Sequence, residues 1–503
     1  MQPDPEICHS ARMARDKRFD GRFYTAVKTT GIFCRPVCPA RPPLERNVEY
    51  FATAAEAAAA GYRPCLRCRP DAAPGSPAWG LVSTTVQRAL GLMRREREAQ
   101  SIEELAERLG ITSRYLRKLF ADHIGLSPLQ VWQTERALFA FSLLRDTSLS
   151  VGDIAFAAGF NSLRRFNGVF KAIYQRTPSE VRRERSGMAS GSVHPEAEPV
   201  RIYLSYRPPF DWPELLGFFA ARALPGVERV VVGNTPEEAV YQRSFRLNGR
   251  RGVLRVAHEP EKDRLRVTVY GEGAAAVLYP LREKLRRLFD LDADSEQICV
   301  HLQGDPLLGK VLLQSPGVRL PGAWDPFEYT LRAILGQQIS VAAATTIAGR
   351  IANRYGETFT GPEGEPVLLF PSAEQLSGAD FSDIGVTRTR AKTLQHFVAA
   401  TLDGEIDFDE PDLERFCAQM TALPGIGDWT AHYTAMRGLS MPDAFPASDL
   451  GILIAFGKEN DGDRKATPKQ ALARAESWRP WRAYAALLLW QSLKLSSSSG
   501  DEK

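Results

Sequence analysis

The spacing of apolar residues changes along the chain and divides it into segments. Residues 101–185 place apolar side chains three and four positions apart, which is the spacing of amphipathic helices. Between residues 200 and 300, short runs such as VRIYLSY and RLRVTVYGE alternate apolar and polar positions, which predicts antiparallel strands. From about residue 305 the helical spacing returns, interrupted by Pro and Gly. The pattern therefore predicts a helical segment, a small sheet and a second helical segment.

Stretches poor in large apolar residues mark the boundaries between these segments. Asp71–Pro77 (DAAPGSP) and Ser186–Pro199 (SGMASGSVHPEAEP) have the composition of flexible linkers, and the C-terminal SSSSGDEK has that of a disordered tail. We therefore expect a multidomain α+β protein with these segments: a cysteine-rich domain at 1–75, a helical domain at 80–185, a linker at 186–199, a small antiparallel α/β domain at 200–303, an all-α domain at 304–494 and a disordered tail at 495–503.

Composition and charge exclude several classes of protein. The chain of 503 residues is 44% apolar and 25% charged, which excludes a fibre or a mostly disordered chain. It contains no apolar run long enough to span a membrane and no apolar secretory segment at its start, so we expect a cytoplasmic protein (the bacterial cytosol or nucleoid) with no membrane partner. Residues 1–186 hold 29 basic and 19 acidic residues, although the whole chain carries only +4. This basic front half predicts a polyanionic partner.

Four of the seven cysteines form two short pairs near the N-terminus. Cys34 and Cys38 are separated by three residues, and Cys65 and Cys68 by two, with 26 residues between the pairs. Such pairs build tetrahedral Zn(Cys)₄ sites, and a reducing compartment favours metal binding over disulfides. Spacing alone favours an inert zinc knuckle.

The residues around the cysteines indicate a reactive site. The runs TAVKTTGIFCRPVCPARPPLERNVEYF and GYRPCLRCRPD resemble the N-terminal domain of the Ada family of DNA-repair proteins. The resemblance implies one Zn²⁺, with Cys34 as both a ligand and the acceptor of a methyl group from a DNA methylphosphotriester. Cys38, Cys65 and Cys68 would be supporting ligands. Methylation would change the charge of the cluster from −2 to −1, which predicts stronger promoter binding.

Residues 101–185 contain two helix-turn-helix pairs. In the first, Ser101 and Glu104 fit a capping box before a Gly turn and a second helix; Val151–Ala158, GFNS and Leu163–Tyr174 repeat the design. A helical bundle with basic faces is the simpler interpretation. The two copies resemble the AraC-type DNA-binding domain, which implies that the second helix of each pair enters a major groove. The implied contacts are Arg114, Tyr115 and Arg117 for one groove, and Ser162, Arg164, Arg165 and Asn167 for the next. Arg165 and Lys171 are also suited to contact phosphate alone.

A glycine-rich turn and a later aspartate stand out near the C-terminus. The turn LPGIGDWTA contains Gly425 and Gly427, whose backbone N–H groups can hold a phosphate at a helix N-terminus. Asp449 follows 22 residues after Gly427, and an isolated Asp is most often a helix cap. Together these elements resemble the helix-hairpin-helix glycosylase superfamily. Further runs, from RPPFDWPELLGFFAARALPGVE to SWRPWRAYAALLLW, look like the AlkA family of alkylpurine DNA glycosylases.

The resemblance assigns the chemistry of this second half. Bifunctional relatives carry a Lys where this chain has Trp429, and we find no C-terminal four-cysteine iron–sulfur motif, so we expect a monofunctional glycosylase without a cofactor. Asp449 would stabilise positive charge on the sugar and direct water. Trp429, Tyr433 and Trp490 match aromatic pocket positions and would stack on a cationic base, although a helical core would also explain them.

Three positions depart from the AlkA pattern. Gln338 stands where AlkA inserts a Leu into the duplex, Ser448 replaces an acidic neighbour of Asp449, and Gln491 replaces an aromatic residue. These departures predict a changed wedge and a changed range of substrates. The O6-alkylguanine transferase half of the Ada family is absent, because we find no Pro-Cys-His-Arg sequence.

We therefore predict a fused alkylation-damage protein. Its zinc domain would accept one methyl group on Cys34, its helix-turn-helix domain would bind a promoter, and its glycosylase would release N-alkylated purines of the 3-methyladenine type. The expected partners are alkylated double-stranded DNA, a promoter and RNA polymerase. The alternative is a methylation-responsive transcription regulator whose glycosylase half is non-catalytic.

Overall fold

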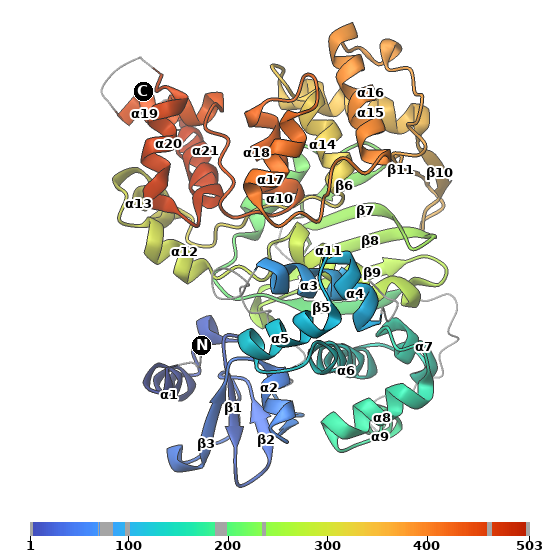
Figure 1. Cartoon of the computed structure of the whole chain (residues 1–503), viewed down its shortest axis with the longest axis vertical. Helices are drawn as coiled ribbons and strands as arrows, with labels where there is room; N and C mark the ends of the chain where they lie inside the picture. Colours follow the sequence, from blue (N-terminus) through green and yellow to red (C-terminus); the bar gives the residue numbers. More distant parts are fainter. Residues whose placement is uncertain are drawn as a thin grey trace. The chain divides into compact units, whose positions relative to one another are not determined.

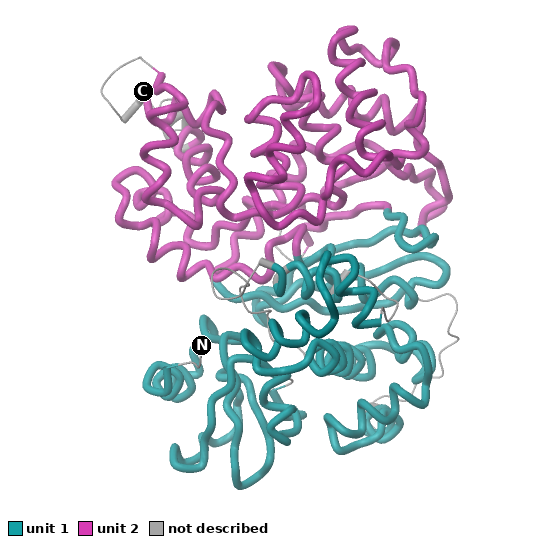
Figure 2. Tube along the Cα trace, viewed as in Figure 1, with its two compact units in different colours: residues 1–208, 245–286 teal, residues 209–244, 287–503 magenta. Residues whose placement is uncertain are grey.

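The chain folds into two compact units, seen in a computed structural model. The structure describes residues 4–68, 70, 84–95, 101–186, 199–233, 238–459 and 465–498. One unit comprises residues 1–208 and 245–286, and the other comprises residues 209–244 and 287–503 (Figure 2). The predicted linkers at 71–77 and 186–199 lie almost wholly outside the described residues.

The cysteine-rich domain is a small sheet with two helices. Its elements are α1 (Pro5–Ala14), β1 (Tyr24–Val27), β2 (Ile32–Cys34), β3 (Val48–Phe51), α2 (Ala54–Ala59) and β4 (Arg63–Pro64). The strands lie in the order β3-β1-β2-β4, with β2 and β4 parallel. Figure 1 shows β1 between β3 and β2. This pairing sets the chain ends after β2 and β4 side by side, and Cys34 and Cys65 lie at those ends. The core under the sheet holds few large side chains, chiefly Tyr24 and Phe33.

The structure describes seven helices in the helix-turn-helix domain. They are α3 (Thr84–Arg95), α4 (Ile102–Arg108), α5 (Ser113–Ile124), α6 (Pro128–Asp146), α7 (Val151–Ala157), α8 (Leu163–Tyr174) and α9 (Pro178–Ser186). The expected helix pairs are confirmed, and so is the capping box, because Ser101 Oγ accepts the Glu104 N–H while the Glu104 carboxylate accepts the Ser101 N–H. The long helix α6 packs against both pairs.

The next domain is built on a five-stranded sheet. Its elements are β5 (Val200–Ser205), α10 (Trp212–Ala220), β6 (Glu228–Val231), β7 (Val240–Leu247), β8 (Arg250–Glu259), β9 (Arg264–Tyr270) and α11 (Leu278–Leu288). The sheet order is β5-β9-β8-β7-β6. Sequence analysis did not single out β7, although Asn248-Gly249 between β7 and β8 is a strong hairpin signal and both residues have positive φ.

In its described residues, the C-terminal domain is helical apart from one hairpin. Its elements are α12 (Ser295–Leu302), α13 (Pro306–Gln314), α14 (Pro326–Leu335), α15 (Val341–Tyr355), β10 (Glu357–Thr360), β11 (Pro366–Leu369), α16 (Arg388–Leu402), α17 (Leu413–Thr421), α18 (Asp428–Gly438), α19 (Leu450–Glu459), α20 (Pro468–Ala475) and α21 (Arg482–Ser498). The β10–β11 hairpin was not expected in this all-α segment. We also expected disorder from residue 495, but α21 continues to Ser498, and residues 499–503 lie outside the described range.

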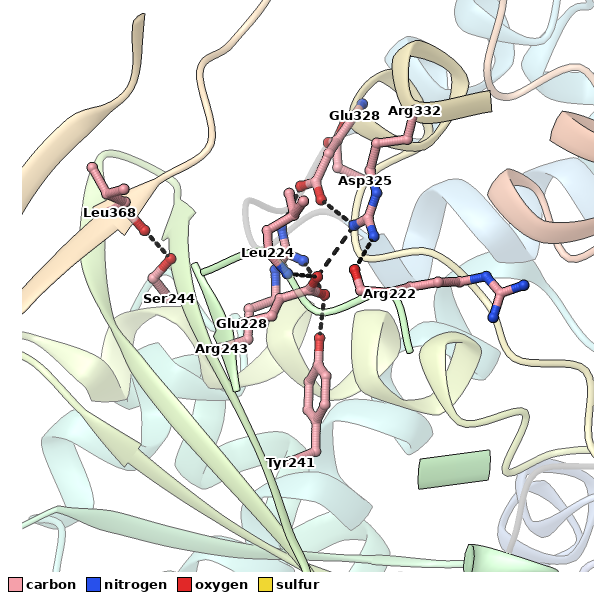
Figure 3. A network of polar contacts seen from close by, with 10 residues as sticks. All are labelled: Arg222, Leu224, Glu228, Tyr241, Arg243, Ser244, Asp325, Glu328, Arg332 and Leu368. Atoms are coloured by element: carbon pink, nitrogen blue, oxygen red, sulfur yellow. Dashed lines mark hydrogen bonds and ion pairs between the residues drawn. The ribbon is translucent and has the colours of Figure 1, made fainter. Parts of the chain in front are cut away.

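A buried network of charges joins β6, β7 and α14 within the second unit (Figure 3). Arg243 Nη1 lies 2.6 Å from Glu228 Oε1, and its Nη2 is ion-paired with Glu328. Arg332 Nη1 lies 3.2 Å from Glu228 and 3.1 Å from Glu328, and the Tyr241 hydroxyl donates to Glu228 at 2.8 Å. Two guanidinium groups thus balance two carboxylates. The network fixes helix α14, which also contributes Tyr329 and Arg332 to the wall of the cavity described below.

Candidate functional site

The four predicted zinc ligands converge in the cysteine-rich domain. Their Sγ atoms all lie within 4.8 Å of one another. Tetrahedral coordination with Zn–S bonds of about 2.3 Å requires S···S separations of roughly 3.8 Å, so the sulfurs fit one Zn²⁺. Cys65 and Cys68 are buried, whereas Cys34 and Cys38 are partly exposed. The cluster therefore has an inner, buried pair and an outer, accessible pair.

A backbone hydrogen bond distinguishes one of the four sulfurs. In the described residues, one backbone N–H, that of Arg35, donates to a cluster sulfur, Cys68 Sγ, at 3.3 Å. Among the described residues we find no backbone N–H that donates to Cys34 Sγ. Such bonds stabilise negative charge on a sulfur and reduce its nucleophilicity. Cys34 is thus a partly exposed sulfur that receives no backbone hydrogen bond in the described residues, unlike the buried Cys68.

The predicted groove-binding arginines all lie on the surface of the second helices. Arg114 and Arg117 on α5, and Arg164 and Arg165 on α8, are exposed. Arg117 Nη2 is hydrogen-bonded to Glu103 Oε1 at 2.8 Å, so this guanidinium would have to leave an ion pair to reach DNA. Ser162 caps α8, because its Oγ accepts the Arg165 N–H at 3.2 Å.

A cavity of about 430 Å³ opens among the helices of the second unit. Its wall comes from α10, α14, α15, α18 and α21 and from the residues preceding α19. Three predicted pocket residues, Trp429, Tyr433 and Trp490, line it together with Asp449. Sequence analysis missed Phe218, Arg222 and Tyr329, which also line the cavity. The run LGFFAARA contains Phe218 and Arg222, and its resemblance to AlkA was the signal that could have pointed to these two residues.

The Asp449 carboxylate accepts four hydrogen bonds. Oδ2 accepts the Trp429 indole N–H at 2.9 Å, and Oδ1 accepts that of Trp490 at 2.8 Å. Oδ1 also accepts the backbone N–H groups of Gly451 at 2.9 Å and Ile452 at 3.1 Å at the start of α19. Asp449 therefore caps α19, and its carboxylate also lies in the cavity wall, where two indole N–H groups hold it in place.

The aromatic residues form a continuous wall beside this carboxylate. The rings of Trp429 and Tyr433, one helical turn apart on α18, are stacked with centroids 5.0 Å apart. Trp490 meets Tyr433 edge-on at 6.1 Å. All three are partly exposed rather than buried in the core. The wall offers π-faces to a flat, electron-poor ligand.

The hairpin before α18 brings backbone donors to the surface. Gly425 has φ +87°, and a Cβ there would lie 2.1 Å from Thr393 Oγ1, so glycine is required by both conformation and space. Gly427 caps α18 without a side-chain hydrogen bond, which leaves the N–H groups of the first turn for a ligand. The Gln337 amide donates to the Gly425 carbonyl and to Thr430 Oγ1, both at 3.0 Å, and ties the hairpin to the end of α14.

Gln338 follows at the tip of the loop between α14 and α15. It is exposed and has φ +58°, an uncommon conformation for a residue other than Gly. The Gln338 amide is therefore exposed on this loop, and its role as a wedge stays a prediction.

The folds and sites define a class of protein that repairs and reads DNA. Family profiles match in order along the chain: the metal binding domain of Ada at residues 7–71, a helix-turn-helix domain at 105–184, the AlkA N-terminal domain at 201–325, and the HhH-GPD superfamily of base excision DNA repair proteins at 331–481. The expected combination of domains is confirmed, and DNA is the partner of such domains.

Relatives narrow the class to one family. The chain is 39% identical over 496 residues to the probable bifunctional transcriptional activator/DNA repair enzyme AlkA of Mycobacterium tuberculosis, covering 98% of this chain and 97% of the relative. It is 35% identical over 292 residues to DNA-3-methyladenine glycosylase 2 of Escherichia coli, covering 57% and 95%. A solved 3-methyladenine DNA glycosylase from Archaeoglobus fulgidus has the same fold in this region, with a TM-score of 0.50 at 23% identity, covering 57% of this chain and 96% of that chain. The protein belongs to the family of bifunctional transcriptional activator/DNA repair enzymes that join an Ada-like half to an AlkA-like half. No helix in the described ranges is long and apolar enough to cross a membrane.

Proposed function

We propose that the second half of the protein hydrolyses the N-glycosidic bond of N-alkylated purines, with Asp449 as the catalytic carboxylate. The observation that carries the proposal is the pair of indole N–H bonds to Asp449 from two residues of the cavity wall, Trp429 and Trp490. These bonds hold the carboxylate beside the place where a flipped base would stack.

The chemistry follows from the charge of the lesion. Alkylation at N3 or N7 gives a purine a formal positive charge, so the base departs as a neutral molecule. The bond to C1′ breaks with its electron pair on the base, and positive charge develops on the sugar. Asp449 stabilises that charge and orients the water that adds to C1′. Trp429 and Tyr433 bind the cationic base through their π-faces.

DNA would be held by the hairpin and the wedge. The free N–H groups of the first turn of α18, after Gly425 and Gly427, are suited to a backbone phosphate. Gln338 would fill the gap left by the flipped base. No lysine stands at position 429, and the cavity-lining Lys494 is ion-paired with Glu214 at 2.6 Å, so we propose simple hydrolysis that leaves an abasic site.

Replacing Asp449 by Asn tests this assignment without disturbing the cap. Asn is as good an N-cap as Asp, so α19 should keep its start while the carboxylate is lost. We expect release of 3-methyladenine from methylated DNA to fall by at least ~100-fold. The matched control is Asp412→Asn, which changes the N-cap of α17 outside the cavity. Undiminished release by the Asp449 variant would refute the assignment. No release by the wild type would favour the alternative of a non-catalytic regulator.

The zinc cluster supports a second activity in the first half. We propose that Zn²⁺ bound by Cys34, Cys38, Cys65 and Cys68 keeps the sulfurs as thiolates and that Cys34 takes a methyl group from a DNA methylphosphotriester. The sulfur bonds to the methyl carbon while the carbon–oxygen bond breaks with its electrons on the phosphate. The accessible position of Cys34 and its lack of a backbone N–H donor in the described chain support this choice.

The methyl transfer is tested by peptide mapping after exposure to methylated DNA. We expect one added methyl group on the peptide that contains Cys34. A methyl group found on Cys38 instead would overturn the choice of nucleophile. We further propose that the methylated cluster binds promoter DNA more tightly through the exposed arginines of α5 and α8, because one negative charge beside the phosphates is removed. Equal affinities of the two forms at one salt concentration would refute this switch.

A further inference from the structure

The outward face of strands β5, β8 and β9 carries a cluster of arginines. Strand β9 lies between β5 and β8, and Figure 1 shows β8 and β9 side by side. On β9 the side chains of Leu265, Val267 and Val269 are fully buried, so this side of the strand faces the core. Because side chains alternate between the two faces of a sheet, the residues between them lie on the opposite face, which is partly open to solvent. These outward residues are Arg264, Arg266, Thr268 and Tyr270.

Strand register brings two further arginines to the sides of Thr268. Arg201 on β5 and Arg255 on β8 are both cross-strand partners of Thr268. Neighbouring strands lie about 4.8 Å apart, so the two arginines flank the threonine at roughly that distance between Cα atoms. Arg266 precedes Thr268 by two positions on the same face of β9. We call these four residues the Thr268 cluster: one hydroxyl with three guanidinium-bearing side chains around it.

Two tyrosines stack on arginines of this face. The guanidinium carbon of Arg255 lies 5.1 Å from the ring centroid of Tyr270. That of Arg264 lies 3.7 Å from the ring centroid of Tyr203. A ring covers the flat side of a guanidinium group, whereas the N–H donors of the group point outward in its plane. Stacking therefore restrains the arginine side chain without occupying its donors.

The charge of this face is strongly positive. Glu259 pairs with Arg264 across the strands, and its carboxylate lies 2.6 Å from Arg264 Nη2 and 3.9 Å from Arg266 Nε. The outward positions that β5, β8 and β9 pair with one another thus hold four arginines and one glutamate. The excess is local, because residues 187–503 contain 41 acidic and 35 basic residues in total. A positive patch in the acidic half of the chain is therefore not a consequence of composition.

The Thr268 cluster can be reached from solvent. Arg201 is exposed, the Arg266 side chain is 44% exposed, and Arg255 and Thr268 are half-buried. Guanidinium groups held this close repel one another, and an anion bound among them would remove the repulsion. Hydroxyl and guanidinium groups are donors that phosphate oxygens accept in protein–DNA complexes. Because the helix-turn-helix and base excision repair domains of this chain have DNA as their partner, duplex DNA is the polyanion that the face fits.

We propose that the Thr268 cluster binds backbone phosphates of duplex DNA and forms a contact site that is independent of sequence and of damage. None of its residues belongs to the wall of the cavity, so this site goes beyond the proposed base release. Phosphate contacts fix where a protein lies on a duplex but carry no sequence information. The cluster therefore adds affinity for undamaged DNA to that of the helix-turn-helix domain and the glycine hairpin.

The test removes two of the arginines and follows binding as a function of salt. Full-length Arg201→Gln/Arg266→Gln is titrated with an undamaged duplex without a promoter sequence, and anisotropy is measured over a range of salt concentrations. Each lost phosphate contact lowers the slope of log affinity against log salt by about 0.9, so we expect a slope smaller by about 2 and an affinity at least ~10-fold lower at about 0.1 M salt. The matched control is Lys310→Gln/Lys469→Gln, which removes two exposed positive charges on α13 and α20 and should keep the wild-type slope.

A second variant, Thr268→Glu, separates DNA binding from folding. The new carboxylate lies among three arginines, so it should attract them, stabilise the sheet and repel a phosphate. We expect the affinity for the duplex to fall at least ~10-fold, because the site is neutralised. Peptides from β5, β8 and β9 should exchange hydrogen no faster than in the wild type. A substitution that only damaged the fold would instead weaken binding and speed exchange together.

Three results would overturn the proposal. The first is a salt slope of the double arginine variant equal to that of the wild type. The second is an equal decrease of the slope in the lysine control, which would mean that total charge alone sets the affinity. The third is unchanged duplex affinity with lost binding to single-stranded RNA titrated in parallel, which would assign the face to another nucleic acid. The arginine variant decides the question even where Thr268→Glu perturbs the sheet, because it changes only exposed side chains.

Discussion

Removing Arg243 should open the structure around α14, because this residue is the centre of the buried network in Figure 3. The side chain of Arg243 is 3% exposed and those of its partners Glu228 and Glu328 are 7% and 6% exposed. Arg243→Met keeps much of the volume and removes the charge. Arg332 would then be left as the single guanidinium between two buried carboxylates.

The loss of stability expected for Arg243→Met follows from the carboxylate charge that is left without a partner. Breaking a buried ion pair by removing one partner costs about 3–5 kcal/mol, because the other charge stays buried without compensation. Since 1.36 kcal/mol corresponds to one decade, the opening equilibrium of this region should rise roughly 150- to 5,000-fold. Arg229→Met is the matched control: Arg229 neighbours Glu228 on β6 but is exposed, so its loss should cost less than ~0.5 kcal/mol.

Native-state hydrogen exchange measured by mass spectrometry can report the opening of this region in the full chain. Global unfolding cannot, because a chain of several domains does not unfold in a two-state manner. Peptides from β6, β7 and α14 should exchange faster in Arg243→Met, whereas peptides from the helix-turn-helix domain should not change. If these peptides exchanged as slowly as in Arg229→Met, the network would contribute no more than a surface ion pair and the reasoning would be wrong.

The pH dependence gives a second check on the same variant. Arg243 and Arg332 hold the pKa of Glu228 below its ordinary value even though burial alone would raise it. A lowered pKa in the folded state stabilises the protein above the unfolded pKa of about 4.3, and this stabilisation is lost as the pH falls through the folded value. Without Arg243 the pKa of Glu228 rises, so Glu228 can take up a proton in mildly acidic solution. The cost of the substitution should therefore be smaller at pH 5 than at pH 7.5.

Three further predictions concern the cavity, the hairpin and one buried acid. Trp490→Phe replaces the indole by a smaller aromatic ring and removes one N–H bond to the Asp449 carboxylate, so single-turnover base release should fall ~10- to 100-fold; an unchanged rate would mean that this bond does not position the carboxylate. Gly425→Ala strains φ +87° and clashes with Thr393, so it should weaken binding to undamaged duplex in an anisotropy titration, and unchanged affinity would exclude the hairpin from the DNA contact. Burial raises the pKa of Asp290 to about 6, so the ionised carboxylate destabilises the fold above that pH, and this destabilisation decreases as the pH falls toward 4. Asp290→Asn should therefore raise the melting temperature more at pH 7.5 than at pH 5. An equal change at both pH values would contradict the raised pKa.

The residues with strong local signals could be predicted from the sequence. The cysteine pairs, the capping box at Ser101 and the glycine hairpin each depend on a few neighbouring residues whose geometry is fixed by bond lengths and backbone sterics. The strand β7 carried such a signal in Asn248-Gly249 but lay between more regular runs and was missed. The β10–β11 hairpin is short, and its pattern in a helical region did not suggest strands.

The inner wall of the cavity could not be predicted from the sequence alone. Tyr329 and Phe218 line the cavity from α14 and α10, and the buried Arg437 of α18 packs against the Phe218 ring; only the packing of these three helices brings them together. Nothing in the spacing of apolar residues shows that Arg437 is fully buried, because an arginine at that position of a helix is usually exposed. The two roles of Asp449 were likewise posed as alternatives, and the structure shows it capping α19 within the wall of the cavity.

Asp449 is both the cap of α19 and the proposed catalytic carboxylate, and this double role determines which mutation could remove the activity and keep the fold. Codons for Asp and Asn differ by one nucleotide, and an Asn side chain can also cap the first turn of α19, whereas on the proposed mechanism it would offer no negative charge to the sugar. One transition in the gene would therefore yield a folded protein that binds damaged bases but does not hydrolyse their glycosidic bond. Because the same chain carries a helix-turn-helix domain, one base change would convert the proposed repair enzyme into a protein that binds damaged DNA and regulates transcription without catalysis.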